Sequence, residues 1–184
     1  MKPRGQLMIE HRLIEKFLAF AAEATKTMKD SSYNPVLIDT IVDFIKTYAD
    51  RTHHGKEEDL LFPLLEARGV PATGCPLEAL LHEHQTGRTL VANLEEATQA
   101  YAVEDSHETR IKLAMVLRQL MKLYPAHIWK EDYLAFPMTN KVLSAEDQQS
   151  LRQMFADVDV AIGQDVLNKQ KAWAESLSPI KLKP

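Results

Sequence analysis

The chain is poor in the residues that mark several common classes of protein. Its 184 residues contain one cysteine, Cys75, which excludes an internal disulfide framework and fits a reducing compartment. Only six glycines occur, and valine and isoleucine never alternate with polar residues as they do in half-buried strands. No apolar run approaches the length of a transmembrane helix, and the start of the chain lacks the apolar segment of a signal peptide. We therefore expect a cytoplasmic protein that does not associate with a membrane.

The charge balance excludes a further class. The 22 Lys and Arg residues are outnumbered by 26 Asp and Glu residues, and no basic patch is available for phosphates. We therefore expect no nucleic-acid partner. The P-loop, dinucleotide-binding and Ser-His-Asp motifs are also missing. With 45% hydrophobic and 26% charged residues, the composition is that of a globular protein with one sizeable core.

Helical periodicity runs through nearly the whole chain, and two segments rich in turn residues interrupt it. These segments, "DSSYNP" at 30–35 and "GVPATGCP" at 69–76, are predicted to be loops. Pro125 is expected to kink or break the helix that contains it. The spacing predicts five helices, over about 6–29, 35–68, 76–101, 106–141 and 145–176.

The lengths of these helices and loops predict an all-α fold. Four antiparallel helices joined by short loops are typical of an up-down-up-down four-helix bundle. We expect residues 1–143 to form the bundle, and residues 144–184 to add a C-terminal helix and a tail to the same domain. Ser144, with Asp147 three residues on, is a suitable N-cap for that last helix. The tail after 176 is expected to be disordered or loosely docked.

Titratable side chains occupy inward-facing positions on all four expected bundle helices. Burying such a group costs several kcal/mol unless it is paired or bound to a metal ion. A hydrogen-bonded network that only specifies the fold would need every donor matched, which imidazoles and carboxylates in this number achieve poorly. A divalent cation resolves the problem directly. The residues concerned are His11, His53, Glu57, His84, His127 and Glu131.

The spacing of these residues suits metal ligation. Residues four apart lie one above the other on a helix, so His53 with Glu57, and His127 with Glu131, can each hold one site. Imidazole and carboxylate ligands without a thiolate favour iron or manganese, with zinc as a further alternative. A carboxylate from each of two helices can bridge two ions on the axis of a bundle.

The second and fourth helices repeat one pattern. "HHGKEEDLLFP" starts at His53, and "HIWKEDYLAFP" starts at His127. Both have Glu four residues after the first His, an acidic residue next, and Phe-Pro at the end. Counting back from the Phe selects His53 over His54, and Glu57 over Glu58. Phe62 and Phe136 are expected to wall the site, and the prolines that follow them to end or bend the helices.

Together with "EHRLIEKFL" on the first helix and "LLHEHQTGR" on the third, these segments resemble the hemerythrin-like, or HHE cation-binding, family over residues 7–140. The resemblance implies a four-helix bundle with two non-haem iron ions, joined by an oxo or hydroxo bridge. It implies that Glu57 and Glu131 bridge the ions. The terminal ligands that it implies are His11, His53, His84 and His127.

Two departures separate the sequence from the oxygen-carrying members of that family. Arg88 stands four residues after His84, where those members have a further His nearby. The fourth helix reads His-x3-Glu instead of a longer His-to-Asp spacing. The resemblance therefore points away from reversible oxygen carriage and towards sensing of iron or oxygen, or handling of peroxide or nitric oxide.

Several positions near the predicted ligands stay open. His54 either completes the shell of the second ion or stands just outside it, and it is kept among the candidate ligands. Glu58 and Asp132 are expected to orient a ligand imidazole or to face water. His82 and His107 are expected to point away from the centre.

Two classes of function compete. The first is a di-iron protein whose partner is a small diatomic molecule or peroxide, with or without catalytic turnover. The second is a sensor without turnover, in which the last helix signals to a protein partner. Storage of metal, or zinc binding without redox chemistry, is a weaker third reading.

Overall fold

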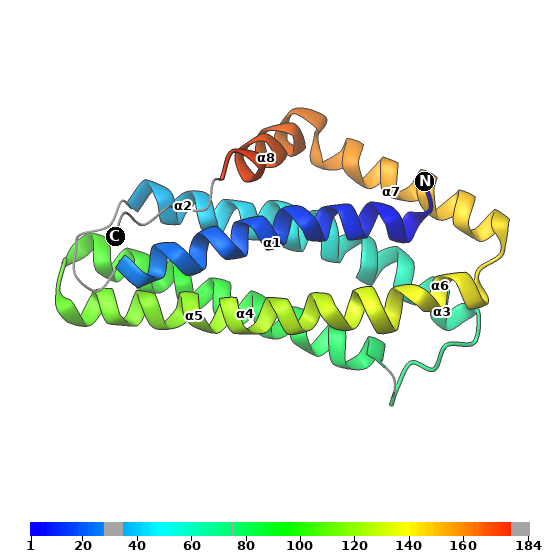
Figure 1. Cartoon of the computed structure of the whole chain (residues 1–184), viewed down its shortest axis with the longest axis horizontal. Coiled ribbons are helices and arrows are strands. Elements are labelled where there is room, and N and C mark those ends of the chain that lie inside the picture. The colour runs from blue at the N-terminus through cyan, green and yellow to red at the C-terminus, as the bar shows by residue number, and fades with distance from the viewer. Residues whose placement is uncertain (28–34, 75, 178–184) are drawn as a thin grey trace.

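The computed structural model of the chain describes residues 1–27, 35–74 and 76–177 (Figure 1). These residues form helices and no strand, which confirms the predicted all-α class. Most of the predicted loop at 30–35, Cys75 and the tail from 178 lie outside the described residues. None of the described helices is long and apolar enough to cross a lipid bilayer.

Four rods alternate in direction along the long axis of the molecule (Figure 1). The first rod is α1 (Pro3–Thr27), and the third is α4 (Pro76–Val103). The second rod consists of α2 (Pro35–Phe44), η1 (Ile45–His54), η2 (Glu57–Leu61) and α3 (Phe62–Ala67). The fourth consists of α5 (His107–Lys130), η3 (Glu131–Ala135) and α6 (Phe136–Val142). This arrangement is the predicted up-down-up-down bundle.

The second and fourth rods contain π-helical turns where the two repeats lie. A π turn has an extra residue per turn and often occurs at functional sites. Pro63 and Pro137 lie in the first turns of α3 and α6, directly after η2 and η3. Proline has no N–H to donate, so a widened turn before it accommodates the missing hydrogen bond. Both rods therefore continue past their prolines, so of the two expected outcomes, an end or a bend of the helix, the end does not occur.

Of the kink or break expected at Pro125, the break does not occur, because α5 continues through Pro125 to Lys130. The neighbouring side chains of Tyr124 and Ile128 are buried in the core. Packing on both sides of the proline holds the helix together, although one backbone hydrogen bond is missing there.

The C-terminal segment differs from the predicted single helix. It forms α7 (Ala145–Ile162) and α8 (Gln164–Ser176), which meet at Gly163. The φ of Gly163 is +106°, a conformation that residues with a Cβ rarely adopt. The predicted N-cap of this segment is confirmed, since Ser144 and Asp147 form a reciprocal capping box. Figure 1 shows α7 and α8 together on one side of the bundle.

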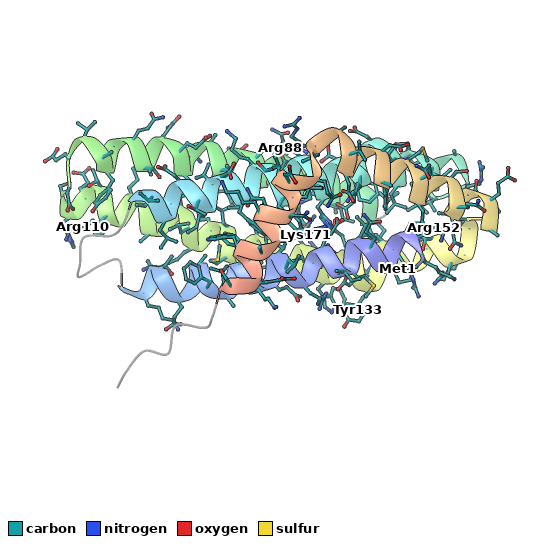
Figure 2. All side chains as sticks on the ribbon, turned by 90° about the horizontal axis from the view of Figure 1, so that it is seen from above. Met1, Arg88, Arg110, Tyr133, Arg152 and Lys171 are labelled. Carbon is teal, nitrogen blue, oxygen red and sulfur yellow. The ribbon has the colours of Figure 1, made fainter. Side chains whose placement is uncertain are left out.

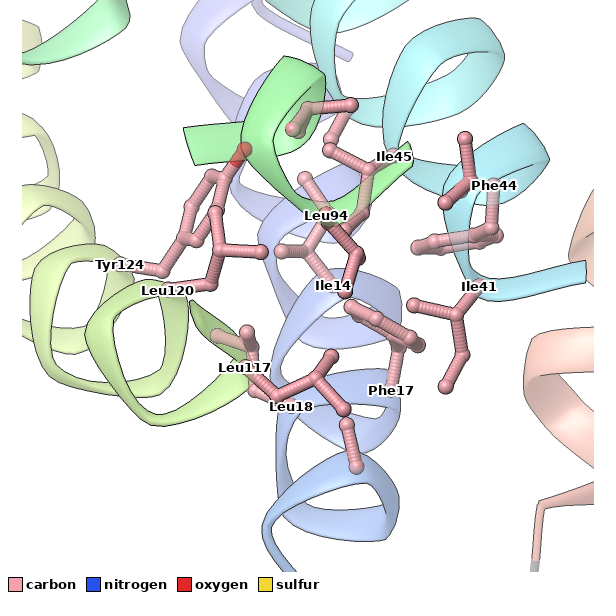
Figure 3. Packing of buried hydrophobic residues seen from close by; sticks show 14 of the residues in the cluster. Ile14, Phe17, Leu18, Ile41, Phe44, Ile45, Leu94, Leu117, Leu120 and Tyr124 are labelled. Carbon is pink, nitrogen blue, oxygen red and sulfur yellow. The ribbon is translucent and has the colours of Figure 1, made fainter. Parts of the chain in front are cut away.

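Two clusters of buried apolar side chains flank the middle of the bundle. Figure 3 shows part of the larger cluster, in which Phe17, Ile41 and Phe44 pack between α1 and α2. The smaller cluster includes Phe62, Phe136 and Phe155. The ring of Phe136 stacks on His11 at 5.3 Å between centroids, and that of Phe62 on His84 at 6.1 Å. The predicted ligands therefore lie between the clusters, with both phenylalanines against them as expected.

Candidate metal centre

All seven candidate ligands meet in the interior of the bundle, and each is at most 3% exposed. Two groups can be distinguished, each with its potential ligand atoms within 4.8 Å of one another. His82 and His107 are exposed, as expected. The first group is His11, His53, Glu57 and Glu131, and the second is His54, His84 and His127.

Glu57 and Glu131 connect the two groups. The Oε1 atom of Glu57 lies 3.5 Å from Nε2 of His53, and its Oε2 atom lies 3.5 Å from Nε2 of His84. In Glu131, Oε2 lies 3.0 Å from Nε2 of His11, and Oε1 lies 3.1 Å from Nε2 of His127. Each carboxylate thus directs one oxygen to each group, as a bridging ligand does.

The centre therefore has two halves. The two-histidine half consists of His11 and His53 with one oxygen from each glutamate. The three-histidine half consists of His54, His84 and His127 with the other two oxygens. Metal–ligand bonds of about 2.1 Å at right angles place neighbouring ligand atoms about 3 Å apart. The separations of 3.0–3.5 Å between imidazole nitrogens and carboxylate oxygens fit a cation in each half.

Every ligand imidazole has a carboxylate at its other nitrogen. A carboxylate accepts the hydrogen of Nδ1–H, which leaves the Nε2 lone pair directed at the centre. This tautomer is the one that a metal ion requires. The Nδ1-to-oxygen distances are 2.7 Å for His11 and Asp132, 2.9 Å for His53 and Glu10, 3.2 Å for His54 and Asp50, 2.6 Å for His84 and Glu58, and 3.1 Å for His127 and Glu83.

Four of these carboxylates form a ring around the bundle. Each lies next to a ligand in the sequence, yet each accepts from a ligand on the following rod. Glu10 accepts from His53 of the second rod, Glu58 from His84 of the third, Glu83 from His127 of the fourth, and Asp132 from His11 of the first. The ring ties each rod to its neighbour and fixes four imidazoles at once.

Glu58 and Asp132 thus orient imidazoles, which was one of their two expected roles. Glu10, Asp50 and Glu83 were missed by the sequence reasoning. A signal for two of them was present, because "EH" occurs at both 10–11 and 83–84. An acidic residue adjacent to each of four ligands is the pattern that marks the ring.

Cations surround the orienting carboxylates. The Lys56 Nζ atom lies 2.6 Å from Glu10, and Arg88 lies 2.8 Å from both Glu58 and Asp50. Arg12 pairs with Asp132, and Lys130 with Glu83. Burial would raise the pKa of Glu10, but His53 and Lys56 lower that pKa to about 2. Against the effect of burial, hydrogen bonds from His84 and Arg88 lower the pKa of Glu58, and those from His127 and Lys130 lower the pKa of Glu83, so these three glutamates are held ionised as acceptors.

The pKa values of Glu57 and Glu131 shift in opposite directions in the protein without a cation. Burial and the charge of Glu131 raise the pKa of Glu57 well above its usual value. Burial acts in the same direction on Glu131, but His127 and His11 hold its pKa well below the usual value. Two buried carboxylates so close together cannot both ionise without a neutralising cation. Without one, Glu57 keeps its proton.

Unpartnered oxygens test whether cations fit here. Both carboxylate oxygens of Glu57 and Oε2 of Glu131 are buried and receive no hydrogen bond from the described residues. Such atoms cost free energy unless something else satisfies them. Two divalent cations would do so for both glutamates, and they would bind to the free Nε2 lone pairs. The residues present therefore fit a pair of cations.

A cavity of about 120 Å³ adjoins the three-histidine half. It lies between η1 and α4, and its walls include His54, Arg88 and Tyr124. Gly87 also lines it, and a Cβ there would lie 3.6 Å from the hydroxyl oxygen of Tyr124. The space is large enough for several water molecules or one small molecule.

The fold and the centre define a class: four-helix-bundle proteins with buried histidine and glutamate residues that could hold cations. Residues 3–139 match the family described as the hemerythrin HHE cation binding domain. Because this match covers most of the chain, the protein belongs to that family, which confirms the resemblance seen in the sequence.

Two curated relatives are the uncharacterized proteins Rv1995 of Mycobacterium tuberculosis and Mb2018 of Mycobacterium bovis. Each is 26% identical to this chain over 152 residues, which are 82% of this chain and 58% of the relative. The chain thus spans less than two thirds of these relatives. No solved structure matches the chain significantly.

Proposed function

We propose that this protein holds two iron ions in the centre and uses them to handle or sense dioxygen, peroxide or nitric oxide. The observation that carries the proposal is the set of five buried imidazoles around two buried glutamates, three of whose four carboxylate oxygens have no hydrogen-bond partner among the described residues. Iron bound there supplies electrons and coordination positions for such molecules. Manganese and zinc suit the same ligands, but zinc has no redox chemistry.

The two halves suggest where a small molecule would bind. The three-histidine half offers three imidazoles and two carboxylate oxygens, and the two-histidine half offers one imidazole fewer. A six-coordinate ion held by the two-histidine half would have more open positions. We therefore place the external ligand there, on the side of His11 and His53.

The surrounding residues keep the centre dry and its ligands fixed. Phe62 and Phe136 cover the faces of His84 and His11, and the ring of carboxylates fixes the orientations of the imidazoles. The Tyr48 hydroxyl is buried without a hydrogen-bond partner among the described residues, and Tyr124 lines the cavity beside His54. Because Tyr124 lies beside the three-histidine half, the Tyr48 hydroxyl is the candidate proton donor to an oxygen species bound in the two-histidine half.

Metal analysis with spectroscopy of the purified protein is the decisive test. About two iron ions per chain and a visible absorption band are expected. A colourless protein that stays folded and free of metal after anaerobic reconstitution with Fe(II) would overturn the proposal. Peroxide and nitric oxide should change the absorption band, and the consumption of either would establish catalytic turnover.

A sensor is the second candidate function, and the placement of α7 favours it. This helix lies beyond the residues that match the family, yet it contacts η1, η2 and α1 around the centre. A sensor would show negligible consumption of peroxide and nitric oxide. It would also show a large gain in thermal stability on binding metal, because the empty site is poorly satisfied.

A further inference from the structure

The C-terminal helices contact the two rods that carry the imidazoles of the two-histidine half. Figure 2 shows α7 and α8, marked by Arg152 and Lys171, lying across the face formed by α1 and the second rod. These two rods carry His11 and His53, the imidazoles of the two-histidine half, and the second rod also carries His54. The family match ends at residue 139, so the contact comes from a segment outside the matched domain.

Lys56 is the point of contact. Its side chain is 0% exposed, which is rare for lysine, and its Nζ atom lies 2.6 Å from Glu10 and 2.6 Å from Asp159 of α7. The ring of Phe155, also on α7, has its centroid 5.9 Å from the same nitrogen. A buried ammonium group needs such partners, since leaving it unpaired costs several kcal/mol. Lys56 therefore depends on α7 as well as on Glu10.

The contact continues to a ligand. One oxygen of Glu10 accepts from Lys56, and the other accepts from Nδ1 of His53 at 2.9 Å. A continuous series of charge-assisted contacts thus runs from α7 to the two-histidine half. It passes from Asp159 through Lys56 and Glu10 to His53. Gln6 also joins α1 to α7, since its amide nitrogen lies 3.2 Å from Asp159.

The corresponding series of contacts in the three-histidine half ends at the lysine, without a second carboxylate from the described residues. Lys130 pairs with Glu83, which accepts from His127, in the same order as in the first series. The side chain of Lys130 is 31% exposed, and no second carboxylate of the described residues pairs with it. The additional carboxylate is a feature of the half in which we place the external ligand.

We propose that docking of α7 and cation binding in the two-histidine half stabilise each other through Asp159, Lys56 and Glu10. A cation on Nε2 of His53 fixes the imidazole and strengthens Nδ1–H as a donor to Glu10. Glu10 then holds Lys56 in place for Asp159. Coupling between two sites is reciprocal, so α7 both senses and supports occupancy of this half. The inference rests on the proposed pair of cations but not on their oxygen chemistry.

The test uses the full-length chain with Asp159→Asn and a matched control, Asp157→Asn. Asp157 is exposed on the same helix, and its carboxylate accepts from Gln153 one turn away. Both variants are titrated anaerobically with Fe(II), and separately with Zn(II). Asp159→Asn should weaken one of two binding phases by about fivefold, the lower end of typical coupling, and leave the other phase unchanged. Asp157→Asn should leave both phases unchanged.

Hydrogen exchange of α7 provides a readout that depends on no activity. Saturation with Zn(II) should slow exchange of the α7 amides in the wild type by about the same fivefold, because coupling is reciprocal. The slowing should disappear in Asp159→Asn. A wild type that binds two cations with unchanged α7 exchange, or an Asp159→Asn variant with both phases intact, would overturn the coupling alone. A wild type that binds no cation would overturn the proposed centre as well.

Discussion

The two halves of the centre are built from the same parts but end up different. Each has an imidazole from a repeat, a glutamate that orients it and a lysine that pairs with that glutamate. These are His53, Glu10 and Lys56 in one half, and His127, Glu83 and Lys130 in the other. The halves differ in their number of imidazoles. His54, which follows His53 in the sequence, adds a third imidazole to one half, whereas the residue that follows His127 is Ile128. They also differ in the exposure of the lysine, since Lys56 is buried against α7 and Lys130 is partly exposed.

This difference teaches how an almost symmetric bundle can offer two unlike sites for cations. The repeats supply equivalent candidate ligands to both halves, and the ring of carboxylates orients an equal number of imidazoles in each half. A single additional imidazole then gives one half five potential ligand atoms and leaves the other half with four. The two-histidine half is in addition linked to α7, through the contact between Lys56 and Asp159.

The largest expected effect comes from removing what the halves share. Glu57→Gln should lower the metal content from about two ions per chain to below one, since Glu57 supplies an oxygen to each half. The metal-free variant should unfold at nearly the wild-type temperature, because Gln resembles the protonated Glu57 of the empty site. Metal analysis and thermal unfolding of the metal-free proteins check both points. Glu66→Gln, on the exposed side of α3, is the control, and retention of two ions by Glu57→Gln would contradict the bridging role.

Exchanging the residue that distinguishes the halves should exchange their properties. His54→Ile should weaken metal binding in the three-histidine half by about 10–100-fold or more, since it removes a ligand outright. Ile128→His should instead add an imidazole beside the two-histidine half and suppress binding of azide there. Azide titrations followed by absorption compare the variants with wild type. Unchanged azide binding in Ile128→His would show that the halves do not differ by this residue.

Removing one orienting carboxylate should affect one half only. Glu10→Gln should weaken metal binding in the two-histidine half, and Glu83→Gln in the three-histidine half, each by about 10–100-fold. Each variant replaces the acceptor of one imidazole, at His53 or at His127. Two-phase metal titrations separate the halves, with exposed Glu96→Gln as the control. Loss of the same phase in both variants would mean that the halves are not independent.

The smallest expected effect is a dependence on pH that differs with and without metal. Burial lowers the pKa of His127, but Glu131 and Glu83 outweigh it and raise that pKa to about 9 from 6.5. The charged imidazole stabilises the metal-free protein below pH 6.5, and this contribution is lost as the pH rises through 9. A metal-bound Nε2 takes no proton, so the gap between the unfolding temperatures of metal-loaded and metal-free protein should widen over this range. Calorimetry at both ends of the range measures the gap, and narrowing would contradict the assignment.

Much of the fold could be predicted because helix formation and burial leave a periodic record in the sequence. Three features follow from the spacing of residues that lie within a few helical turns of one another. They are the four rods, the inward-facing positions of Glu57 and Glu131, and the register of the two repeats. The break at Gly163 was missed because a lone glycine in a helical pattern signals a break only where packing requires its positive φ. The continuity of α5 through Pro125 likewise depends on the packing of its neighbours.

By itself, the sequence determined which side chains face the axis, because periodicity specifies the face of a helix. Only the tertiary structure decided which side chains serve which half. His53 and His54 are adjacent in the chain, yet they belong to different halves, because one faces α1 and the other faces α4 and α5. Glu10 orients a histidine 43 residues away rather than its neighbour His11. Contacts of this kind depend on how the rods are rotated and shifted against one another, and the packing of the whole core sets those positions.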